Sequence, residues 1–435
     1  MADATTVDAI TATWRLESAR LVGALVRMTR DVELAEDLAQ DALVAALEHW
    51  PTGGVPANPA AWLMTTAKRR AVDTFRRADT LRRKTEELGH AAAEEVSAMP
   101  DLDSQVDHIE DDVLRLVFLC CHPALTPESR AALTLRLVGG LTTSEIARGF
   151  LVPDATMGQR ISRAKRTLAE AGAQLELPTG TERTQRLDDV MAVVYLVFTE
   201  GYVATAGDDW TRPDLAMEGI RLARLLADVA PDELEVHGLQ ALLELQGSRL
   251  HARTDAAGNP LLLDDQDRSR WDHLLIRRGV TALRTAEDMA ARGVPVGRYF
   301  LQAQIAHEHA RTATPEETNW PRIAALYDLL REAAPGPVVE VNRAVAHGRA
   351  FGPAAGMKVL DEVPAGAVGV SPLIPSVRGD LLSRAGEHDA AAASFDEAAR
   401  VTRNAAERLL LEGRATASRS AAHRRTGATG PSGLQ

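Results

Sequence analysis

The chain has 435 residues, of which 45% are hydrophobic and only 4% are aromatic, and its formal net charge is −12. A chain of this length is too long to fold around a single hydrophobic core, so we expect two or three domains. The negative charge excludes a simple polycation that coats nucleic acid, although local basic patches still permit contact with DNA. With so few aromatic residues the cores must rest on Leu, Val and Ala, which favours helices.

The two cysteines, Cys120 and Cys121, are adjacent in sequence. Neighbouring cysteines rarely bridge, so we predict no disulfide framework. Cys120-Cys121-His122 lacks a second ligand pair at zinc spacing, so we predict core packing there, with no metal and no cofactor. No signal peptide is visible, and the longest apolar stretch, 190–198, is too short for a bilayer. We therefore expect a cytoplasmic protein that makes no membrane contact.

Nearly every segment shows helical periodicity and none shows the alternation of a strand, so the predicted fold class is all-α. Breaks rich in Pro and Gly, together with polar stretches, mark the expected boundaries. The prediction is a first helical module at 10–78, a linker at 79–108, a second module at 109–172, a large helical extension at 185–415 and a disordered tail at 416–435.

The linker is strongly acidic. Residues 94–112 carry eight acidic side chains and no Lys or Arg, and they lie between basic patches at 68–84 and 148–166. Two interpretations stay open: the stretch is a solvating linker, or it covers both basic patches until the modules separate.

The most specific local pattern is a helix-turn-helix at 141–168. Thr142 or Thr143 is expected to cap a short first helix, Val152-Pro153 ends the turn, and Asp154 is expected to cap the second helix. In that second helix four apolar residues recur at spacings of four, three and four and predict one buried stripe: Met157, Ile161, Ala164 and Leu168.

The opposite face of this second helix is polar and basic. An apolar back and a basic front suit the major groove of DNA, where Arg reads guanine and also holds phosphate. The alternative is a surface helix with a solvated basic face. The candidate DNA-binding residues are Thr156, Gln159, Arg160, Arg163 and Arg166.

The segments 31–43 and 58–77 resemble region 2 of the extracytoplasmic-function (ECF) sigma factors of the sigma-70 family, and 109–170 resembles their region 4. Phe118–Leu125, Phe198–Tyr202 and Asp264–Trp271 resemble the subgroup with a long tetratricopeptide-like C-terminal extension. The resemblance implies binding to core RNA polymerase and promoter DNA, with the extension as a regulator and as the docking place of an unidentified regulatory protein. Leu151 departs from the Gly usual in the family's turn.

The resemblance also assigns roles within the first module. Asp37, Gln40 and Asp41 share one helix face, which in the family binds the clamp helices of the polymerase. A second set follows the Pro-rich loop 51–59 and would melt and capture the −10 element. This set is Trp62, Lys68, Arg69, Arg76 and Arg77, with Trp62 open between a core role and a base contact.

The extension carries one pattern of a helical repeat. Small residues at Gly379, Ala391 and Ala398 would let two helices approach, with Phe395 between them. This predicts a tetratricopeptide-like unit, and the alternative is a plain helical hairpin. The stretch 320–361 suggests a second, weaker unit.

The segment 264–272 is too polar for a core. It could be a capped helix start, an interface with region 4 or the polymerase, or a catalytic carboxylate site. The candidate interface residues are Asp264, Asp265, Asp267, Arg268, Arg270 and Trp271.

The predicted function is that of a sigma factor, which binds and does not catalyse. Two rivals stay open: a stand-alone helix-turn-helix regulator with a ligand-sensing helical domain, and an enzyme housed in the extension around 264–272.

Overall fold

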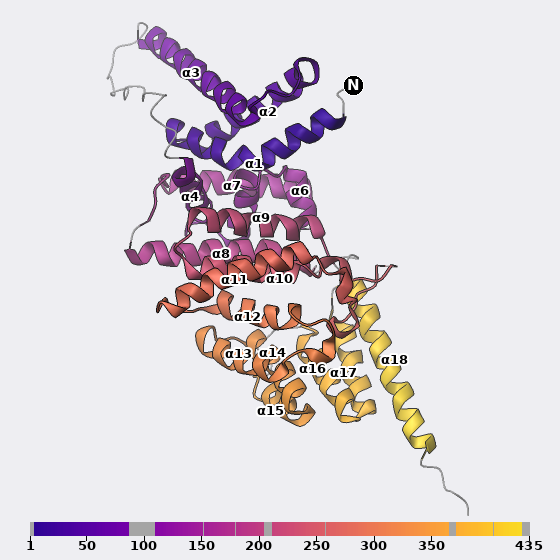
Figure 1. Ribbon diagram of the computed structural model, residues 1–435. Coiled ribbons are helices and arrows are strands. Elements are labelled where there is room, and N and C mark those ends of the chain that lie inside the picture. The colour runs from indigo at the N-terminus through magenta and orange to yellow at the C-terminus, as the bar shows by residue number, and fades with distance from the viewer. Residues whose placement is uncertain are drawn as a thin grey trace, which may run out of the picture. The chain divides into compact units, whose positions relative to one another are not determined.

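The structure, a computed structural model, describes residues 4–86, 109–150, 152–178, 180–203, 211–256, 258–364, 371–402 and 404–428. These residues are helical almost throughout, and among them the only extended pairing is an isolated bridge between Thr254 and Pro260. The predicted all-α class is therefore confirmed. The chain divides into two compact units, Met1–Leu196 and Val197–Gln435, which are described separately (Figure 1).

Among its described residues, the first unit has seven complete helices and the first part of an eighth. These are α1 (Ala4–Thr29), α2 (Val32–Gly53), α3 (Pro59–Glu86), α4 (Ile109–Cys120), α5 (Pro127–Leu137), α6 (Thr143–Gly149), α7 (Asp154–Glu170) and α8 (Gly180–Tyr202), which continues into the second unit. Helix α3 runs eight residues past 78, where the linker was expected to begin. Most of the acidic stretch 94–112 lies outside the described residues.

Short polar side chains fix where the first helices begin. Arg30 adopts a left-handed φ of 56° and separates α1 from α2. Oδ1 of Asp31 then accepts hydrogen bonds from the amides of Glu33 (2.8 Å) and Leu34 (3.1 Å). Asn58 does the same for α3 by accepting from the Ala61 amide at 3.0 Å. These caps satisfy amides that have no partner inside the helix.

The end of α4 forms the core of the first unit. Phe118, Cys120 and Cys121 are fully buried. Burial raises the pKa of the Cys121 thiol to about 12, and its Sγ lies 3.7 Å from the Thr134 hydroxyl. Arg186 of α8 donates a 2.7 Å hydrogen bond to the Phe118 carbonyl. Core packing of the cysteine pair, as predicted, is confirmed.

The acidic stretch ends in a buried charge. Asp112 of α4 has no exposed surface, and it pairs with Arg27 of α1 at 3.2 Å and with Arg115 at 3.5 Å. An unpaired carboxylate at such a depth would be strongly destabilising, so both arginines stabilise it, and the pair with Arg27 holds α4 to α1. Asp112 therefore anchors α4 and is not part of a mobile acidic cover.

The second unit is a succession of helices that follow one another in chain order (Figure 1). Its α-helices after α8 are α9 (Pro213–Val229), α10 (Leu234–Gly247), α11 (His273–Ala291), α12 (Arg298–Ala310), α13 (Trp320–Ala333), α14 (Pro337–Phe351), α15 (Pro353–Asp361), α16 (Leu373–Ala385), α17 (His388–Val401) and α18 (Ala405–Ala428). Short 3-10 turns lie between them at η2 (Leu250–Ala252), η3 (Leu263–Asp265), η4 (Arg268–Arg270) and η5 (Pro315–Glu317).

Two glycines let helices of the second unit touch through their backbones. A Cβ atom on Gly219 of α9 would lie 2.9 Å from the backbone nitrogen of Phe198 in α8. A Cβ on Gly238 of α10 would lie 2.7 Å from the backbone nitrogen of Phe300 in α12. Both distances are below any real contact of a Cβ atom, so these crossings require glycine.

The last helices partly agree with the sequence prediction. The expected contact between Gly379 of α16 and Phe395 of α17 is confirmed, because a Cβ on Gly379 would lie 2.6 Å from the Phe395 ring. The tetratricopeptide-like character of this hairpin stays a prediction. The expected disorder from 416 onward is wrong up to Ala428, because α18 continues to that residue and buries Ala415 and Ser418.

Candidate nucleic-acid interface

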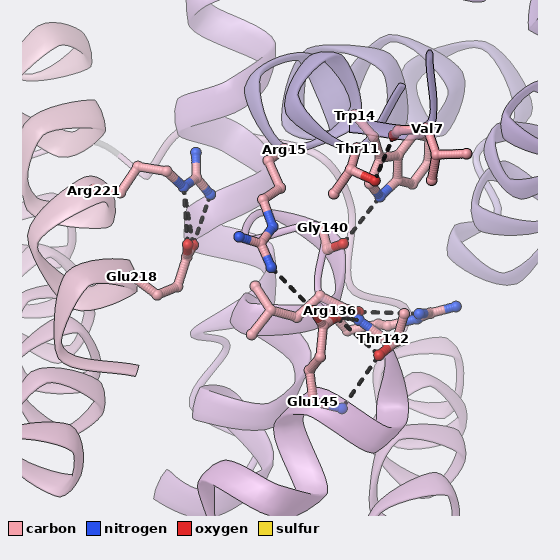
Figure 2. A network of polar contacts seen from close by, with 11 residues as sticks. Val7, Thr11, Trp14, Arg15, Arg136, Gly140, Thr142, Glu145, Glu218 and Arg221 are labelled. Atoms are coloured by element: carbon pink, nitrogen blue, oxygen red, sulfur yellow. Dashed lines mark hydrogen bonds and ion pairs between the residues drawn. The ribbon is translucent and has the colours of Figure 1, made fainter. Parts of the chain in front are cut away.

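The first helix of the predicted helix-turn-helix, α6, begins with a reciprocal cap. Thr142 Oγ1 accepts from the Glu145 amide at 3.2 Å, and Glu145 Oε2 accepts from the Thr142 amide at 2.7 Å (Figure 2). Partial burial acts to raise the pKa of Glu145, but the bonds from Thr142 and the charge of Arg15 outweigh it and lower that pKa. Of the two threonines considered, Thr142 makes the cap.

The expected role of Asp154 is wrong. The residue before α7 is Pro153, which makes no side-chain cap, and Asp154 is the first residue of the helix. The Asp154 carboxylate instead accepts a hydrogen bond from the Ser144 hydroxyl, which ties α6 to α7. A negative charge in the first turn of α7 still complements the helix dipole. Leu151, the departure from the family's turn, lies outside the described residues.

The two faces of α7 separate as the sequence predicts. All four residues of the apolar stripe are buried, and Met157 has no exposed surface. The opposite face is open to solvent at Thr156, Gln159, Arg163 and Arg166, while Arg160 is half-buried. A basic face on a helix whose back is fixed in a core is the arrangement that a major-groove reader requires.

Helix α3 presents a second basic face. Arg69, Arg76 and Arg77 are exposed, and Lys68 is half-buried. Phe75, on the same helix, is 40% exposed. An exposed aromatic ring among cations is suited to stack on an unpaired base. Sequence reasoning missed Phe75, because a helical Phe is far more often a core residue.

Trp62 takes an intermediate position. It is half-buried, and its ring packs edge-on against Trp50 at a centroid distance of 5.5 Å. Trp50 itself is buried and closes the end of α2. Trp62 thus packs on a core residue while the residue stays partly exposed, so both roles left open by the sequence remain compatible with its position.

Helix α2 presents an acidic face. The helix contains five acidic residues and no Lys or Arg. Asp37 and Asp41 are exposed, Gln40 is half-buried, and Asp41 pairs with Arg70 at 3.0 Å. Partial burial raises the pKa of Asp37, as do its acidic neighbours, while Lys165 opposes them.

Two apolar residues extend this acidic face. Val44 is 48% exposed and Leu47 is 44% exposed. They follow Gln40 at spacings of four and seven, so they share its side of the helix. Exposed apolar residues beside charges mark protein-binding surfaces when they adjoin one another. The spacing of Val44 and Leu47 is visible in the sequence, but that spacing is equally compatible with a buried apolar stripe on the helix.

Glu36 lies on the same helix and is buried, with its side chain only 7% exposed. Arg136 of α5 donates to its Oε1 at 2.5 Å, and Lys165 of α7 contacts its Oε2. One carboxylate of the first module therefore receives cations from two helices of the second. Sequence reasoning did not identify Glu36.

In the extension, the segment 264–272 begins helices by capping. Oδ1 of Asp272 accepts from the amides of Leu274 (2.8 Å) and Leu275 (3.0 Å) at the start of α11. Asp267 caps η4 by accepting from the Ser269 amide at 3.0 Å. The prediction of a capped helix start therefore accounts for two acidic residues of this segment, Asp267 and Asp272.

Two further residues of this segment serve the packing of the second unit. Arg268 is buried, and its Nη1 donates to the carbonyls of His309 and Thr312 at 2.9 Å each. Trp271 is 3% exposed. Neither side chain is available to another molecule in this conformation.

The remaining candidates of this segment differ in exposure. Asp264 is half-buried and pairs with Arg349 at 2.5 Å and with Arg384 at 3.5 Å. Asp265, Asp267 and Arg270 are exposed. The predicted interface stays a prediction and now depends on these exposed residues. In the described part of the chain, no group of three His, Cys, Asp or Glu side chains has the arrangement to hold a metal ion.

None of the described helices is both long and apolar enough to cross a bilayer.

Comparison with known proteins agrees with this arrangement. Residues 14–80 match sigma-70 region 2, residues 115–168 match sigma-70 region 4, and residues 186–287 match a family of unknown function (DUF6596). No solved structure matches the chain.

Relatives of two kinds match. The uncharacterized protein R00370 of Rhizobium meliloti is 40% identical over 90% of this chain and 91% of its own length. The ECF RNA polymerase sigma factor SigK of a Mycobacterium species is 29% identical over 36% of this chain and 78% of its own length. The probable ECF RNA polymerase sigma factor SigI of Mycobacterium tuberculosis is 28% identical over 38% of this chain and 56% of its own length.

Both sigma-70 regions are thus present in this chain, region 2 before region 4, and the similarity to R00370 extends over 90% of the chain. The chain belongs to the extracytoplasmic-function sigma factors of the sigma-70 family.

Proposed function

We propose that this chain binds core RNA polymerase and directs it to specific promoters, with α2 as the polymerase-binding element and α3 and α7 as the DNA-binding elements. The observation that carries the proposal is the contrast between two exposed surfaces of one unit. Helix α2 is acidic with exposed apolar residues, whereas the exposed face of α7 is basic. The first surface suits a basic protein helix, and the second suits DNA.

The mechanism is binding. Helix α7 enters the major groove at the −35 element, where Arg163 and Gln159 reach base edges and Arg166 reaches phosphate. Helix α3 lies at the −10 element, where Arg69, Arg76 and Arg77 attract the separated strand. Trp62 and Phe75 provide rings for bases that leave the stack. Nucleotide addition is left to the polymerase, and we assign no catalytic role to this chain.

The extension regulates or supports these steps. Its exposed Asp265, Asp267 and Arg270 form the candidate surface for a regulatory protein or for the polymerase itself. We place the chain in the cytoplasm, where its polymerase partner is. A stand-alone regulator would bind DNA without the polymerase, and nothing in that function requires the acidic face of α2.

The test is a reconstitution with the full chain. Core polymerase alone, and core polymerase with this chain, are given a library of promoter fragments, and run-off transcripts are sequenced. We expect discrete start sites only when the chain is present, and co-purification of the chain with the core. Promoter binding without co-purification would favour the stand-alone regulator, and the absence of any specific transcript would contradict the proposal.

A further inference from the structure

We propose that the second unit binds phosphate, either as the free ion or as the phosphate group of a small molecule, at a cluster of arginines, where it replaces the carboxylate of Asp264. The arginine cluster consists of Arg249, Arg253, Arg268 and Arg349. The proposal goes beyond the proposed function, because it gives the extension a ligand whose binding needs neither polymerase nor DNA.

Parts of the chain that lie far apart in sequence meet at this cluster. Arg249 follows α10 and donates a hydrogen bond to the hydroxyl of Tyr202, at the end of α8. Its guanidinium also lies 5.8 Å from the centre of the Trp271 ring, and the guanidinium of Arg268 lies 5.1 Å from the same centre. The cluster is thus built from the ends of α8 and α10 and from the segment around η4.

Aromatic rings support the other two arginines. Arg253 lies 3.9 Å from the centre of the Tyr202 ring, and Arg349 of α14 lies 4.5 Å from the centre of the Trp320 ring. A ring engages a face of the guanidinium, whereas the N–H donors lie in the plane of that group. Aromatic support therefore holds an arginine in place without consuming its hydrogen-bond donors.

Two arginines of the cluster face only neutral acceptors. Within the described part of the chain, neither Arg249 nor Arg268 forms an ion pair with a carboxylate. Arg249 donates to a phenol, and Arg268, which is 9% exposed, donates to the carbonyls of His309 and Thr312 and to the Thr318 hydroxyl. A buried cation without a counter-charge is unfavourable, so an anion beside Arg249 and Arg268 would be stabilised.

Neighbouring groups respond to this positive charge. Burial acts to raise the pKa of the Tyr202 hydroxyl, but Arg249 and Arg253 outweigh it and lower that pKa. Burial, together with the charges of Arg249 and Arg268, lowers the pKa of His309 to about 3. One imidazole therefore lies in the field of both arginines, and that field favours negative charge.

Buried nitrogen atoms that have no hydrogen-bond partner within the described residues lie at the cluster. They include Nε of Arg249, Nε of Arg268, Nε1 of Trp271 and Nδ1 of His309. Buried polar atoms are rarely left unsatisfied, and an ion is one of their usual partners. The Nε atoms of arginine and the Nε1 atom of tryptophan can only donate, so the ligand must be an acceptor.

A phosphate group meets these requirements better than a carboxylate. It carries about −1.5 to −2 charges at pH 7, which balances both Arg249 and Arg268, and its oxygens accept from several directions. A carboxylate would balance only one of the two. Trp271 is 3% exposed, so the phosphates of a DNA duplex could not approach it, and the ligand has to be small.

Asp264 is the anion that the ligand would replace. Its half-buried carboxylate pairs with Arg349 at 2.5 Å and with Arg384 at 3.5 Å. Burial acts to raise the pKa of Asp264, but these two arginines outweigh it and lower that pKa, so the group is ionised at neutral pH. Its charge also acts on Arg268, where it opposes the lowering of the pKa by burial. Phosphate would therefore enter as the Asp264 side chain rotates away.

The experiment is isothermal titration calorimetry of the full chain at fixed salt, without polymerase or DNA. Inorganic phosphate tests the free ion, glycerol 3-phosphate and AMP test phosphorylated small molecules, and acetate tests a carboxylate. We expect saturable binding of one phosphate group per chain and no saturable binding of acetate. Equal affinities for inorganic phosphate and the esters would identify the free ion, and tighter binding of an ester would identify a phosphorylated molecule.

Removing donors should weaken binding. Arg249→Gln should raise the Kd for phosphate by about tenfold, because a hydrogen bond to a charged group is lost. Trp271→Phe keeps a ring but removes Nε1, and should raise the Kd by about threefold or more. Arg278→Gln is the matched control: it makes the same charge change at an exposed position of α11 and should leave the Kd unchanged. Circular dichroism of each variant checks that the helices are intact.

Removing the competing anion should have the opposite effect. Asp264→Asn should lower the Kd for phosphate by about threefold to tenfold, because the negative charge that phosphate must displace is gone. Asp265→Asn makes the same change at the exposed neighbouring position and should have little effect. A role of Asp264 in packing alone would not tighten binding, so the sign of this change separates the two.

Absence of saturable binding of every phosphate probe would overturn the proposal, and acetate binding as tight as phosphate binding would overturn the choice of ligand. Equal changes in Arg249→Gln and Arg278→Gln, or weaker binding by Asp264→Asn, would overturn the site. If Arg249→Gln does not fold, Trp271→Phe and Asp264→Asn decide. All these outcomes are independent of the proposed function, whose own failure is the absence of promoter-specific transcripts in the reconstitution.

Discussion

The indole of Trp14 and the carbonyl of Gly140 form a buried 2.9 Å hydrogen bond between the first helix and the turn that precedes α6. Gly140 adopts a left-handed φ of 69°, and a Cβ there would lie 2.6 Å from the Ser18 hydroxyl oxygen and 3.2 Å from Trp14 Nε1. The bond therefore depends on glycine for two reasons, the backbone conformation and the space beside α1.

Gly140→Ala should lower the free energy of unfolding by about 2–4 kcal/mol, because strain and overcrowding add. Gly172→Ala is the control: its φ is also left-handed, at 61°, but nothing lies within 4 Å of the added carbon, so only strain of about 1–2 kcal/mol is expected. Urea unfolding of both variants gives the comparison. Equal losses would show that crowding against α1 contributes nothing.

On α7, Arg163→Ala should weaken binding of the chain to its promoter by about 1–3 kcal/mol, because an exposed Arg on a groove-facing helix contacts a base edge or phosphate. The measurement is the Kd of the polymerase complex for promoter DNA at fixed salt. Arg278→Ala removes the same charge from an exposed position of α11 and should leave that Kd unchanged. A similar effect of both variants would indicate a general charge effect and not recognition by α7.

On α2, Val44→Ser should weaken binding to core polymerase by about tenfold, since burying an exposed Val side chain contributes roughly 1.5 kcal/mol. Leu16→Ser is the control, because Leu16 on α1 is 67% exposed and lies outside the acidic face. Titration of labelled chain with core polymerase gives both constants. The α2 assignment would be abandoned if Val44→Ser bound as tightly as the wild-type chain.

His309 makes the second unit sensitive to acid. Burial, together with the charges of the nearby Arg249 and Arg268, lowers its pKa to about 3. The unfolded chain, in which this histidine has an ordinary pKa near 6.5, binds a proton that the folded chain does not. This contribution to stability is complete above pH 6.5 and is lost progressively as the pH falls from 6.5 toward 3.

His309→Gln should remove this dependence. Between pH 7 and pH 5 the wild-type chain should lose about 1–2 kcal/mol more unfolding free energy than the variant does. His273→Gln, at an exposed position, controls for the loss of a histidine. This difference is measured by monitoring the unfolding of the C-terminal unit with circular dichroism at the two pH values. An identical pH dependence in wild type and His309→Gln would contradict the burial argument.

In the last hairpins, Gly379→Ala and Gly413→Ala should act in opposite directions. The first places a carbon 2.6 Å from the Phe395 ring and should destabilise the unit by about 1–3 kcal/mol. The second lies on exposed α18 with nothing within 4 Å and should stabilise it by about 0.5–1 kcal/mol. Thermal unfolding checks both signs. Adding Phe395→Leu to Gly379→Ala should recover part of the loss, because the shorter side chain leaves room.

The helical class and the buried stripe of α7 could be predicted because both leave a local, periodic record in the sequence. The stripe from Met157 to Leu168 depends only on spacings within one helix. The segment around Asp272 was weighed as a helix start for the same reason, since a cap lies next to the amides that it satisfies.

Glu36 could not be predicted as a contact, because its partners Arg136 and Lys165 lie in other helices and no local pattern records such a pair. Asp154 was misassigned because Pro153 takes the cap position. The Ser, Ala and Arg content at the end of α18 favours disorder. Leu411, Ala415 and Ser418 recur there at helical spacing and are all buried, so a usable signal was present.

The glycine crossings at Gly219 and Gly238 have a mechanical consequence. Helices in backbone contact leave no side-chain layer between them that could deform, so α9 resists sliding over α8, and α10 resists sliding over α12. A displacement of one helix in either pair is therefore transmitted to the other helix of that pair. The beginning of the extension is therefore stiff at these two crossings.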